Sequence, residues 1–113
     1  MIEDEKHSKP MIGLVCYANY CRSPVAELLL KERFNNEFEF YSAGINPIYK
    51  GSIDPRSLTF LKDEGIKQKI HTPRKITLDM IKSSKIIFGL DFSILDYLNK
   101  NFQRYSDKFR IFS

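Results

Sequence analysis

The stretch of sequence that decides the fold reads Met11-Ile-Gly-Leu-Val-Cys16-Tyr-Ala-Asn-Tyr-Cys21-Arg22-Ser23-Pro24. Residues 11–16 form a short apolar run, of the kind that fills a strand buried on both faces of a parallel sheet. Ser23 followed by Pro24 is typical of a helix start, with a capping hydroxyl and then a proline at the first helical position. The stretch therefore predicts a strand, a short loop that begins at Cys16, and a helix.

Strands and helices alternate along the rest of the chain. The predicted elements are a helix over residues 24–35, a strand over 38–42, a helix over 55–64 that Asp54 caps and Gly65 ends, a helical turn over 78–81, a strand over 85–90, a helix capped by Asp91, and a strand over 109–112. This alternation predicts a three-layer α/β/α fold in which helices cover both faces of a four-stranded parallel sheet. The cysteine loop then lies at the carboxyl end of the first strand.

Length and composition indicate one folded domain. With 113 residues, 42% of them hydrophobic and 28% charged, the chain is too short for two separate cores. Residues 1–10 are polar and without periodicity, so we expect a flexible N-terminal extension ahead of a domain that spans residues 11–113. The formal net charge of +4 favours anionic partners.

Cysteine content and hydropathy indicate the compartment. The chain has 2 cysteines, too few for the disulfide framework of a small secreted protein. The chain contains no apolar run of signal-peptide or membrane-spanning character, and its Lys and Arg residues form no nucleic-acid motif. We therefore expect a cytoplasmic protein whose partners include neither nucleic acid nor a membrane.

The cysteine loop has the chemistry of a phosphate site with a nucleophile. Backbone N–H groups in so short a loop, together with the positive end of a helix, can converge on one dianion. The same field and the cationic Arg22 favour the thiolate of Cys16, which is the nucleophilic form. Arg22 can offer two parallel N–H donors to two phosphoryl oxygens, and Ser23 can donate to the sulfur. We predict Cys16 and Arg22 as catalytic residues.

The loop resembles the signature of the low-molecular-weight protein tyrosine phosphatases. The resemblance continues in the same order through Ser42-Ala43-Gly44, Asp54-Pro55-Arg56, Gly65-Ile66, His71, Arg74 and Asp91. It implies a flavodoxin-like sheet, no metal or other cofactor, and hydrolysis of a phosphotyrosine protein or small aryl phosphate through a phosphocysteine. Inorganic phosphate and other oxyanions are implied ligands, and the oligomeric state stays open.

The resemblance also implies roles for individual residues. The phosphate-binding loop comprises Tyr17, Ala18, Asn19, Tyr20, Cys21, Arg22 and Ser23. Asn19 is implied to hold a strained backbone through Ser42 and His71, with Asp91 orienting His71. Cys21 is implied to form a reversible disulfide with Cys16. Ile48 and Tyr49, in the long loop after the second strand, are expected to form a wall against the substrate.

The sequence departs from the family pattern in two ways. Ala18 replaces a usual glycine, which would cost on the order of 1 to 2 kcal/mol if its φ were positive. The family's general acid lies in an Asp-Pro-aromatic motif beyond the last predicted strand, and that motif and a final helix are missing from residues 1–113. The general acid is therefore unassigned, since neither Asp91 nor Asp107 is predicted to fill the role, and truncation and true loss both stay open.

Three functions are compatible with the sequence. A phosphotyrosine phosphatase is the leading one, because relatives that act on phosphoarginine carry threonine where this chain has Tyr20. A catalytically impaired module that binds phosphate or a phosphoprotein is the alternative. An arsenate reductase is less favoured, because the electron relay of those enzymes needs further cysteines and none follows Cys21.

Overall fold

Four parallel strands form the centre of the molecule. The computed structural model describes residues 9–20, 22–48, 54–66 and 71–112. The strands are β1 (Met11–Cys16), β2 (Glu39–Gly44), β3 (Ile86–Gly89) and β4 (Phe109–Ile111), and they lie in the order β2-β1-β3-β4. All three neighbouring pairs are parallel.

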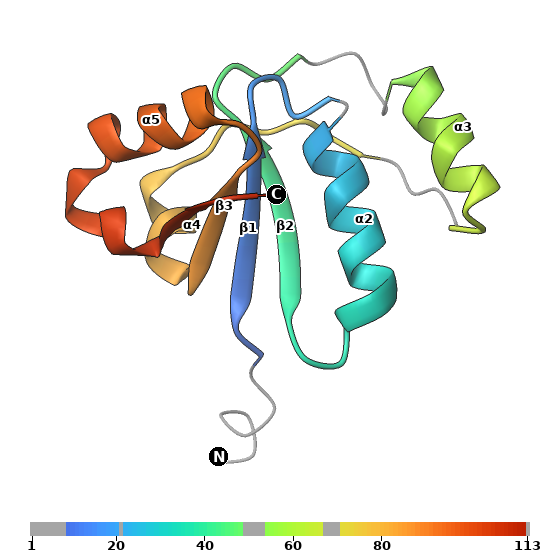
Figure 1. Cartoon of the computed structure of the whole chain (residues 1–113), viewed down its shortest axis with the longest axis horizontal. Helices are drawn as coiled ribbons and strands as arrows, with labels where there is room; N and C mark the ends of the chain where they lie inside the picture. Colours follow the sequence, from blue (N-terminus) through green and yellow to red (C-terminus); the bar gives the residue numbers. More distant parts are fainter. Residues whose placement is uncertain (1–8, 21, 49–53, 67–70, 113) are drawn as a thin grey trace.

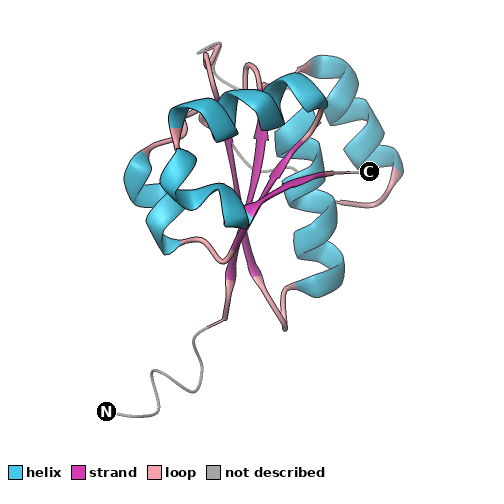
Figure 2. Cartoon of the chain, turned by 60° about the vertical axis from the view of Figure 1, so that its left-hand side comes forward, coloured by secondary structure: helices cyan, strands magenta, loops and turns pink. Residues whose placement is uncertain are grey.

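Helices cover both faces of this sheet. They are α2 (Arg22–Phe34), α3 (Pro55–Asp63), α4 (Leu78–Ser83), α5 (Phe92–Asn101) and the 3₁₀ helix η1 (Gln103–Lys108). Figures 1 and 2 show α2 and α3 on one side of the sheet and α4 and α5 on the other. The three-layer architecture with a four-stranded parallel sheet is the one that the alternating sequence predicted.

Two apolar clusters hold the layers together. The larger cluster joins the sheet to α4 and α5, and its buried members are Val15, Tyr41, Ala43, Ile76, Ile81, Ile87, Ile94, Leu98 and Phe109. The smaller lies between α2 and α3, where Leu61 and Ile66 pack against Val25, Leu28, Leu29 and Leu58. Leu14 and Val15 are both 0% exposed, so β1 is buried on both faces, as its continuous apolar run predicted.

The predicted helix starts are confirmed at Asp54 and Asp91 but not at Ser23. Asp54 accepts hydrogen bonds from the backbone N–H groups of the first turn of α3, and Asp91 accepts one from Ile94 at the start of α5. Ser23 lies inside the first turn of α2, and its hydroxyl hydrogen bonds to loop residues. The serine hydroxyl therefore belongs to the loop site and not to a helix cap.

The segment before β4 also differs from expectation. No helix was predicted for residues 103–108, yet they form η1. Lys108 at its end donates to the carbonyls of Ile81, Lys82 and Ser84 at 2.9, 3.1 and 2.8 Å. A cation at the carboxyl end of α4 is favourable because the last carbonyls of a helix carry partial negative charge and lack the N–H partner four residues on. This tertiary contact, invisible in local sequence, orders the segment.

Candidate active site

The cysteine loop lies at the carboxyl end of β1 and is fastened to the chain that leaves β2. Backbone N–H groups of Ile45, Asn46 and Ile48 donate to the carbonyls of Cys16, Tyr17 and Ala18 at 3.1, 2.7 and 3.0 Å. A side chain at Gly44 would stand only 2.8 Å from the Tyr17 carbonyl oxygen, so this close approach requires glycine. Backbone hydrogen bonds alone therefore hold the cysteine loop against the segment that follows β2.

Cys16 sits at the bottom of the loop with donors aimed at its sulfur. The residue is 3% exposed and its thiol is free. Sγ accepts a hydrogen bond from the Asn19 backbone N–H at 3.2 Å and lies 2.9 Å from Ser23 Oγ. The sulfur therefore lies beside a backbone N–H and a hydroxyl from the first turn of α2, both within hydrogen-bond distance.

Asn19 has a strained backbone conformation within the loop. Its φ is 53°, and it alone among the described non-glycine residues has positive φ. The side chain is fully buried and donates from Nδ2 to Ser23 Oγ at 2.9 Å and to Ser42 Oγ at 3.0 Å. Ala18 does not have positive φ. The backbone strain that a side chain would cause there at positive φ is therefore absent.

His71 and Arg74 approach Asn19 from the segment before α4. His71 Nε2 lies 2.9 Å from the Asn19 carbonyl oxygen, and the backbone N–H of Arg74 donates to Asn19 Oδ1 at 2.9 Å. Arg74 Nε also donates to the Ser42 carbonyl at 3.1 Å. Asn19, Ser42 and His71, which the family resemblance implied as one group, do lie together.

Glu27 belongs to the site although the sequence did not single it out. It lies on α2, is 8% exposed, and accepts a hydrogen bond from Ser42 Oγ at 2.6 Å. Lys31 Nζ lies 2.6 Å from its other carboxylate oxygen. A glutamate on the first helix after the loop was visible in the sequence, but an (i, i+4) pair with lysine resembles an ordinary solvated helix face.

Arg22 forms an ion pair with Asp91. Arg22 Nη1 lies 3.1 Å from Asp91 Oδ2, and both side chains are substantially exposed. Hydrogen bonds from Ser93 and the Ile94 backbone, followed by the Arg22 guanidinium, hold the pKa of Asp91 below its ordinary value. The expected orientation of His71 by Asp91 is not what the structure has: Asp91 binds Arg22, and His71 binds Asn19.

The remaining predicted residues lie around the mouth or outside the described residues. Tyr17 is 54% exposed and Ile48 is 38% exposed, and the Tyr17 hydroxyl accepts a hydrogen bond from Asn46 at 3.2 Å. The carbonyl of Tyr20 accepts from the Asp54 backbone N–H at 3.2 Å, which ties the loop to the start of α3. Cys21 and Tyr49 lie outside the described residues, so the disulfide and half of the substrate wall stay predictions.

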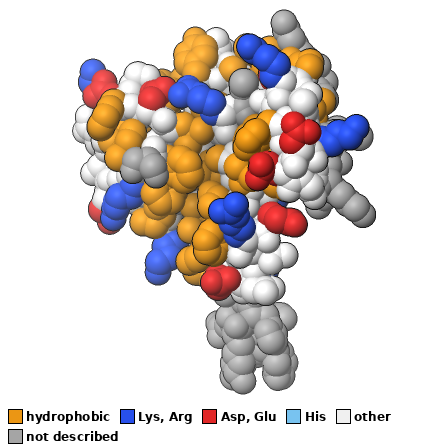
Figure 3. Space-filling model, turned by 45° about the vertical axis from the view of Figure 1, so that its right-hand side comes forward, with side chains coloured by type: hydrophobic (Ala, Val, Ile, Leu, Met, Phe, Trp, Pro, Cys, Tyr) orange, Lys and Arg blue, Asp and Glu red, His pale blue; other side chains and the backbone are white. Residues whose placement is uncertain are grey.

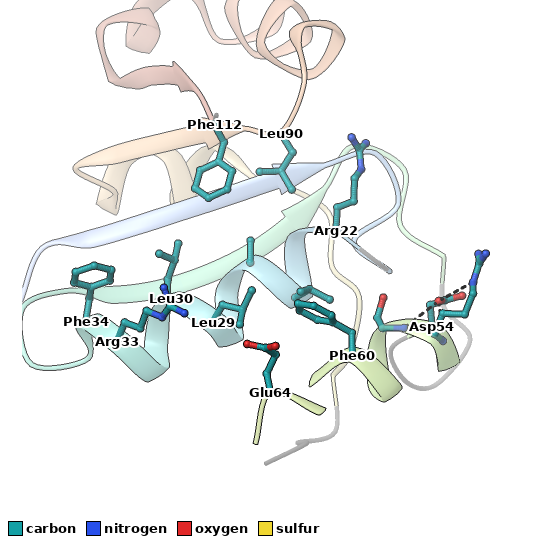
Figure 4. Close-up of a pocket in the computed structure, with 14 residues that line it drawn as sticks. Arg22, Leu29, Leu30, Arg33, Phe34, Asp54, Phe60, Glu64, Leu90 and Phe112 are labelled. Carbon is teal, nitrogen blue, oxygen red and sulfur yellow. Dashed lines mark hydrogen bonds and ion pairs between the residues drawn. The ribbon is translucent and has the colours of Figure 1, made fainter. Parts of the chain in front are cut away.

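An apolar groove runs away from Arg22 between α2, α3 and the ends of β3 and β4. Its volume is about 860 Å³. In Figure 4, Phe60, Leu90 and Phe112 reach into it from three different segments, with Arg22 at one end. Figure 3 shows hydrophobic side chains gathered on the surface that faces the viewer, with charged groups around them. The groove therefore reaches the candidate site at Arg22.

Fold and loop together define an α/β protein whose free cysteine lies in an oxyanion-type loop at the carboxyl end of a central parallel strand. The family model described as low molecular weight phosphotyrosine protein phosphatase matches residues 11–113. The chain belongs to this family, and its sheet is the flavodoxin-like one of that class.

Relatives with different names share this fold. The chain is 33% identical over 76 residues to the low molecular weight protein-tyrosine-phosphatase Ptp of Acinetobacter johnsonii, covering 67% of this chain and 53% of that protein. It is 31% identical over 83 residues to an arsenate reductase of Staphylococcus aureus, covering 74% and 61%. The YwlE arginine phosphatase from Geobacillus stearothermophilus superposes with a TM-score of 0.83 at 26% identity, covering 90% of this chain and 66% of that one.

The chain thus spans 53 to 61% of the length of these two curated relatives. Their names cover tyrosine phosphatase and arsenate reductase, so family membership leaves the reaction of this chain to be argued from its site. No helix among the described residues is long and apolar enough to cross a membrane.

Proposed function

We propose that the chain is a cysteine-dependent phosphatase that hydrolyses phosphotyrosine in a protein or small aryl phosphate. The observation that carries the proposal is the Cys16 sulfur, which receives the Asn19 N–H at 3.2 Å and lies 2.9 Å from the Ser23 hydroxyl at the head of α2. This arrangement favours a thiolate and leaves loop N–H groups and Arg22 to bind the dianion.

The reaction has two steps. The Cys16 thiolate attacks phosphorus, the phosphorus–oxygen bond to the tyrosine breaks, and the electron pair leaves on the phenolate. Water then attacks the phosphocysteine, and the sulfur departs as a thiolate that the Ser23 hydroxyl stabilises. Arg22 turns from Asp91 to two oxygens of the phosphoryl group and balances their charge in both steps. Because a thiolate nucleophile needs a reducing compartment, we place the protein in the cytoplasm.

The described carboxylates near the loop are poorly suited to protonate the leaving phenolate. The lowered pKa of Asp91 keeps it ionised at neutral pH. Asp54 accepts hydrogen bonds from Arg56 and Ser57 at the start of α3. Without an acid the phenolate leaves unprotonated, and general acid catalysis is typically worth roughly 10² to 10⁴ in rate. We therefore expect slow turnover, fastest for phenols that leave easily.

Hydrolysis of p-nitrophenyl phosphate tests the proposal. The chain should release p-nitrophenolate, and an acid-quenched sample should carry one phosphoryl group on Cys16 by tandem mass spectrometry. Cys16→Ser should show neither the turnover nor the modified cysteine. Release by the wild-type chain no faster than by Cys16→Ser, with no phosphocysteine, would contradict the enzymatic proposal.

The engaged carboxylates favour a second candidate, a module that binds phosphate or a phosphorylated partner without hydrolysing it. Calorimetric titration with tungstate and with phosphate should then show binding that Arg22→Met removes, while no phosphocysteine accumulates. Phosphotyrosine and phosphoarginine should be compared in the same assays, because one structural relative is named an arginine phosphatase.

A further inference from the structure

The hydrogen bonds around Asn19 have only one consistent direction. A backbone N–H can only donate, so the Arg74 N–H fixes Oδ1 as the side of the Asn19 amide that faces it at 2.9 Å. Nδ2 then faces Ser23 and Ser42, and it donates to both hydroxyls. Because Ser23 accepts from Asn19, its own proton is free to donate. Its acceptors are the Cys16 sulfur at 2.9 Å and, at the longer distance of 3.5 Å, the Ala43 carbonyl.

Ser42 needs an acceptor for its own proton, and Glu27 supplies it. Ser42 Oγ donates to Glu27 Oε1 at 2.6 Å, in a site where both residues are buried. Lys31, which can only donate, takes the other oxygen at 2.6 Å. The carboxylate is therefore an acceptor at both ends, and Ser42 is left free to accept from Asn19.

We infer that Glu27, held in place by Lys31, is a positioning residue for the Cys16 loop, acting through Ser42 and Asn19. It touches neither the sulfur nor the phosphate site. Its effect is to keep Asn19 in the orientation that supports the strained backbone at φ 53° and the Ser23 to Cys16 contact. The inference rests on the proposed function, because it assigns a role within the same loop.

Other charged groups face the loop from different elements. His71 and Arg74 approach from the segment before α4. Arg22, at the start of α2, pairs with Asp91, at the start of α5. Within the described residues, the ion pair of Glu27 is with Lys31. Substitutions at Glu27 and Lys31 therefore leave the other charged contacts of the loop in place.

The test is Glu27→Gln, which keeps the shape of the side chain and removes its charge. Lys31 must hold the amide oxygen, so the amide NH₂ turns to Ser42, and Ser42 then meets two donors. The Ser42 proton then has no acceptor in a buried site, so the Ser42 hydroxyl and the Asn19 amide must reorient, and the thiolate loses support. The rate of alkylation of Cys16 by iodoacetamide, followed at Cys16 by tandem mass spectrometry, should reach its half-maximum about one pH unit higher, a tenfold change in thiolate population.

Adding Lys31→Met should reverse this shift. Without the lysine the amide can rotate its oxygen toward Ser42, so the double variant should recover most of the wild-type pH profile. Glu32→Gln removes an exposed charge from the same helix and is the matched control, with the profile of the wild type. A role that is merely structural would leave the double variant at least as impaired as the single one.

The inference is overturned if Glu27→Gln leaves the alkylation profile unchanged, or if Lys31→Met brings no recovery. If Glu27→Gln does not fold, Ser42→Ala is the second variant, because it removes the same hydrogen bond between Ser42 and Glu27. The pH of half-maximal alkylation must then rise by a similar amount. Alkylation requires no turnover, so these outcomes stand whether or not the chain hydrolyses p-nitrophenyl phosphate. The experiment therefore distinguishes a failure of the phosphatase proposal from a failure of this inference.

Discussion

Asp91 combines two contacts in one side chain. It caps α5 through the Ile94 backbone N–H at 3.0 Å and meets Arg22, the predicted phosphate clamp, at 3.1 Å. Under the proposed function, Arg22 leaves the Asp91 carboxylate to bind a phosphoryl group, and the planar guanidinium can make two parallel hydrogen bonds to either. A single residue therefore links the order of α5 to the resting position of the clamp.

Asp91→Asn should make stability less dependent on acid pH. The asparagine retains the cap but carries no charge, and the Asp91 pKa lies below its ordinary value of 3.8. A lowered native pKa adds stability that is fully present above 3.8 and is lost as the pH falls through the native value. Urea unfolding should show wild type more stable than Asp91→Asn at pH 7, with the difference vanishing in acid.

Asp96→Asn is the control for that comparison. Asp96 pairs with Lys100 on the exposed side of α5 at 3.0 Å, and surface pairs of this kind contribute little. Its substitution should change stability by less than about 0.5 kcal/mol at either pH. A wild-type advantage over Asp91→Asn that persists in acid would contradict the charge-based account.

At the level of elements, the stability of α3 depends on the residues at its two ends. Asp54 caps its start, and Gly65 follows its end with φ 75°. The N–H groups of Gly65 and Ile66 donate to Lys62 and Leu61 at 3.0 and 2.9 Å, which satisfies carbonyls of the last turn. The helix also carries Leu61, which is 0% exposed, into the smaller cluster with α2.

Gly65→Ala should lower the free energy of unfolding by roughly 1 kcal/mol. A Cβ at this position meets nothing within 4 Å, so the cost is backbone strain at positive φ and not a clash. Gly65→Asn should cost less, because asparagine tolerates the left-handed region. Urea denaturation of the three proteins measures both differences, and an alanine variant as stable as wild type would contradict the strain argument.

At the scale of the whole molecule, the exposed apolar groove sets the solution behaviour. Phe60 is 46% exposed and Phe112 is 37% exposed, and both line the groove of about 860 Å³. Contiguous apolar surface of this kind is uncommon on the outside of a monomer. The described chain therefore presents a surface on which apolar molecules can adsorb next to its candidate site.

Phe60→Ser should reduce the fluorescence of bound anilinonaphthalene sulfonate by about half, in keeping with removal of one aromatic wall of the groove. The control is Phe92→Ser, which removes a phenylalanine that is 75% exposed but does not line the groove. Equal losses in the two variants would mean that the dye reads scattered exposed side chains and not the groove.

Prediction from the sequence was most accurate where the cause is local. The apolar run of β1, the Asp54 and Asp91 caps and the Gly65 stop all act within a few residues, and each lies where it was expected. Element ends shifted by one or two residues, for example in α2 and β2, because helix ends also depend on tertiary contacts. The η1 helix was missed for the same reason, since its lysine binds carbonyls of α4.

The sequence by itself determined the layered α/β fold and the place of the cysteine loop, because alternation, caps and the Cys16 to Pro24 spacing are properties of neighbouring residues. Only the tertiary structure decided how the loop is held. The Arg74 N–H reaches Asn19 across 55 positions, and Ser42 reaches Glu27 across 15. Such partners are chosen by the packing of the segment before α4 and of β2 against α2, and no local pattern specifies the direction of their hydrogen bonds.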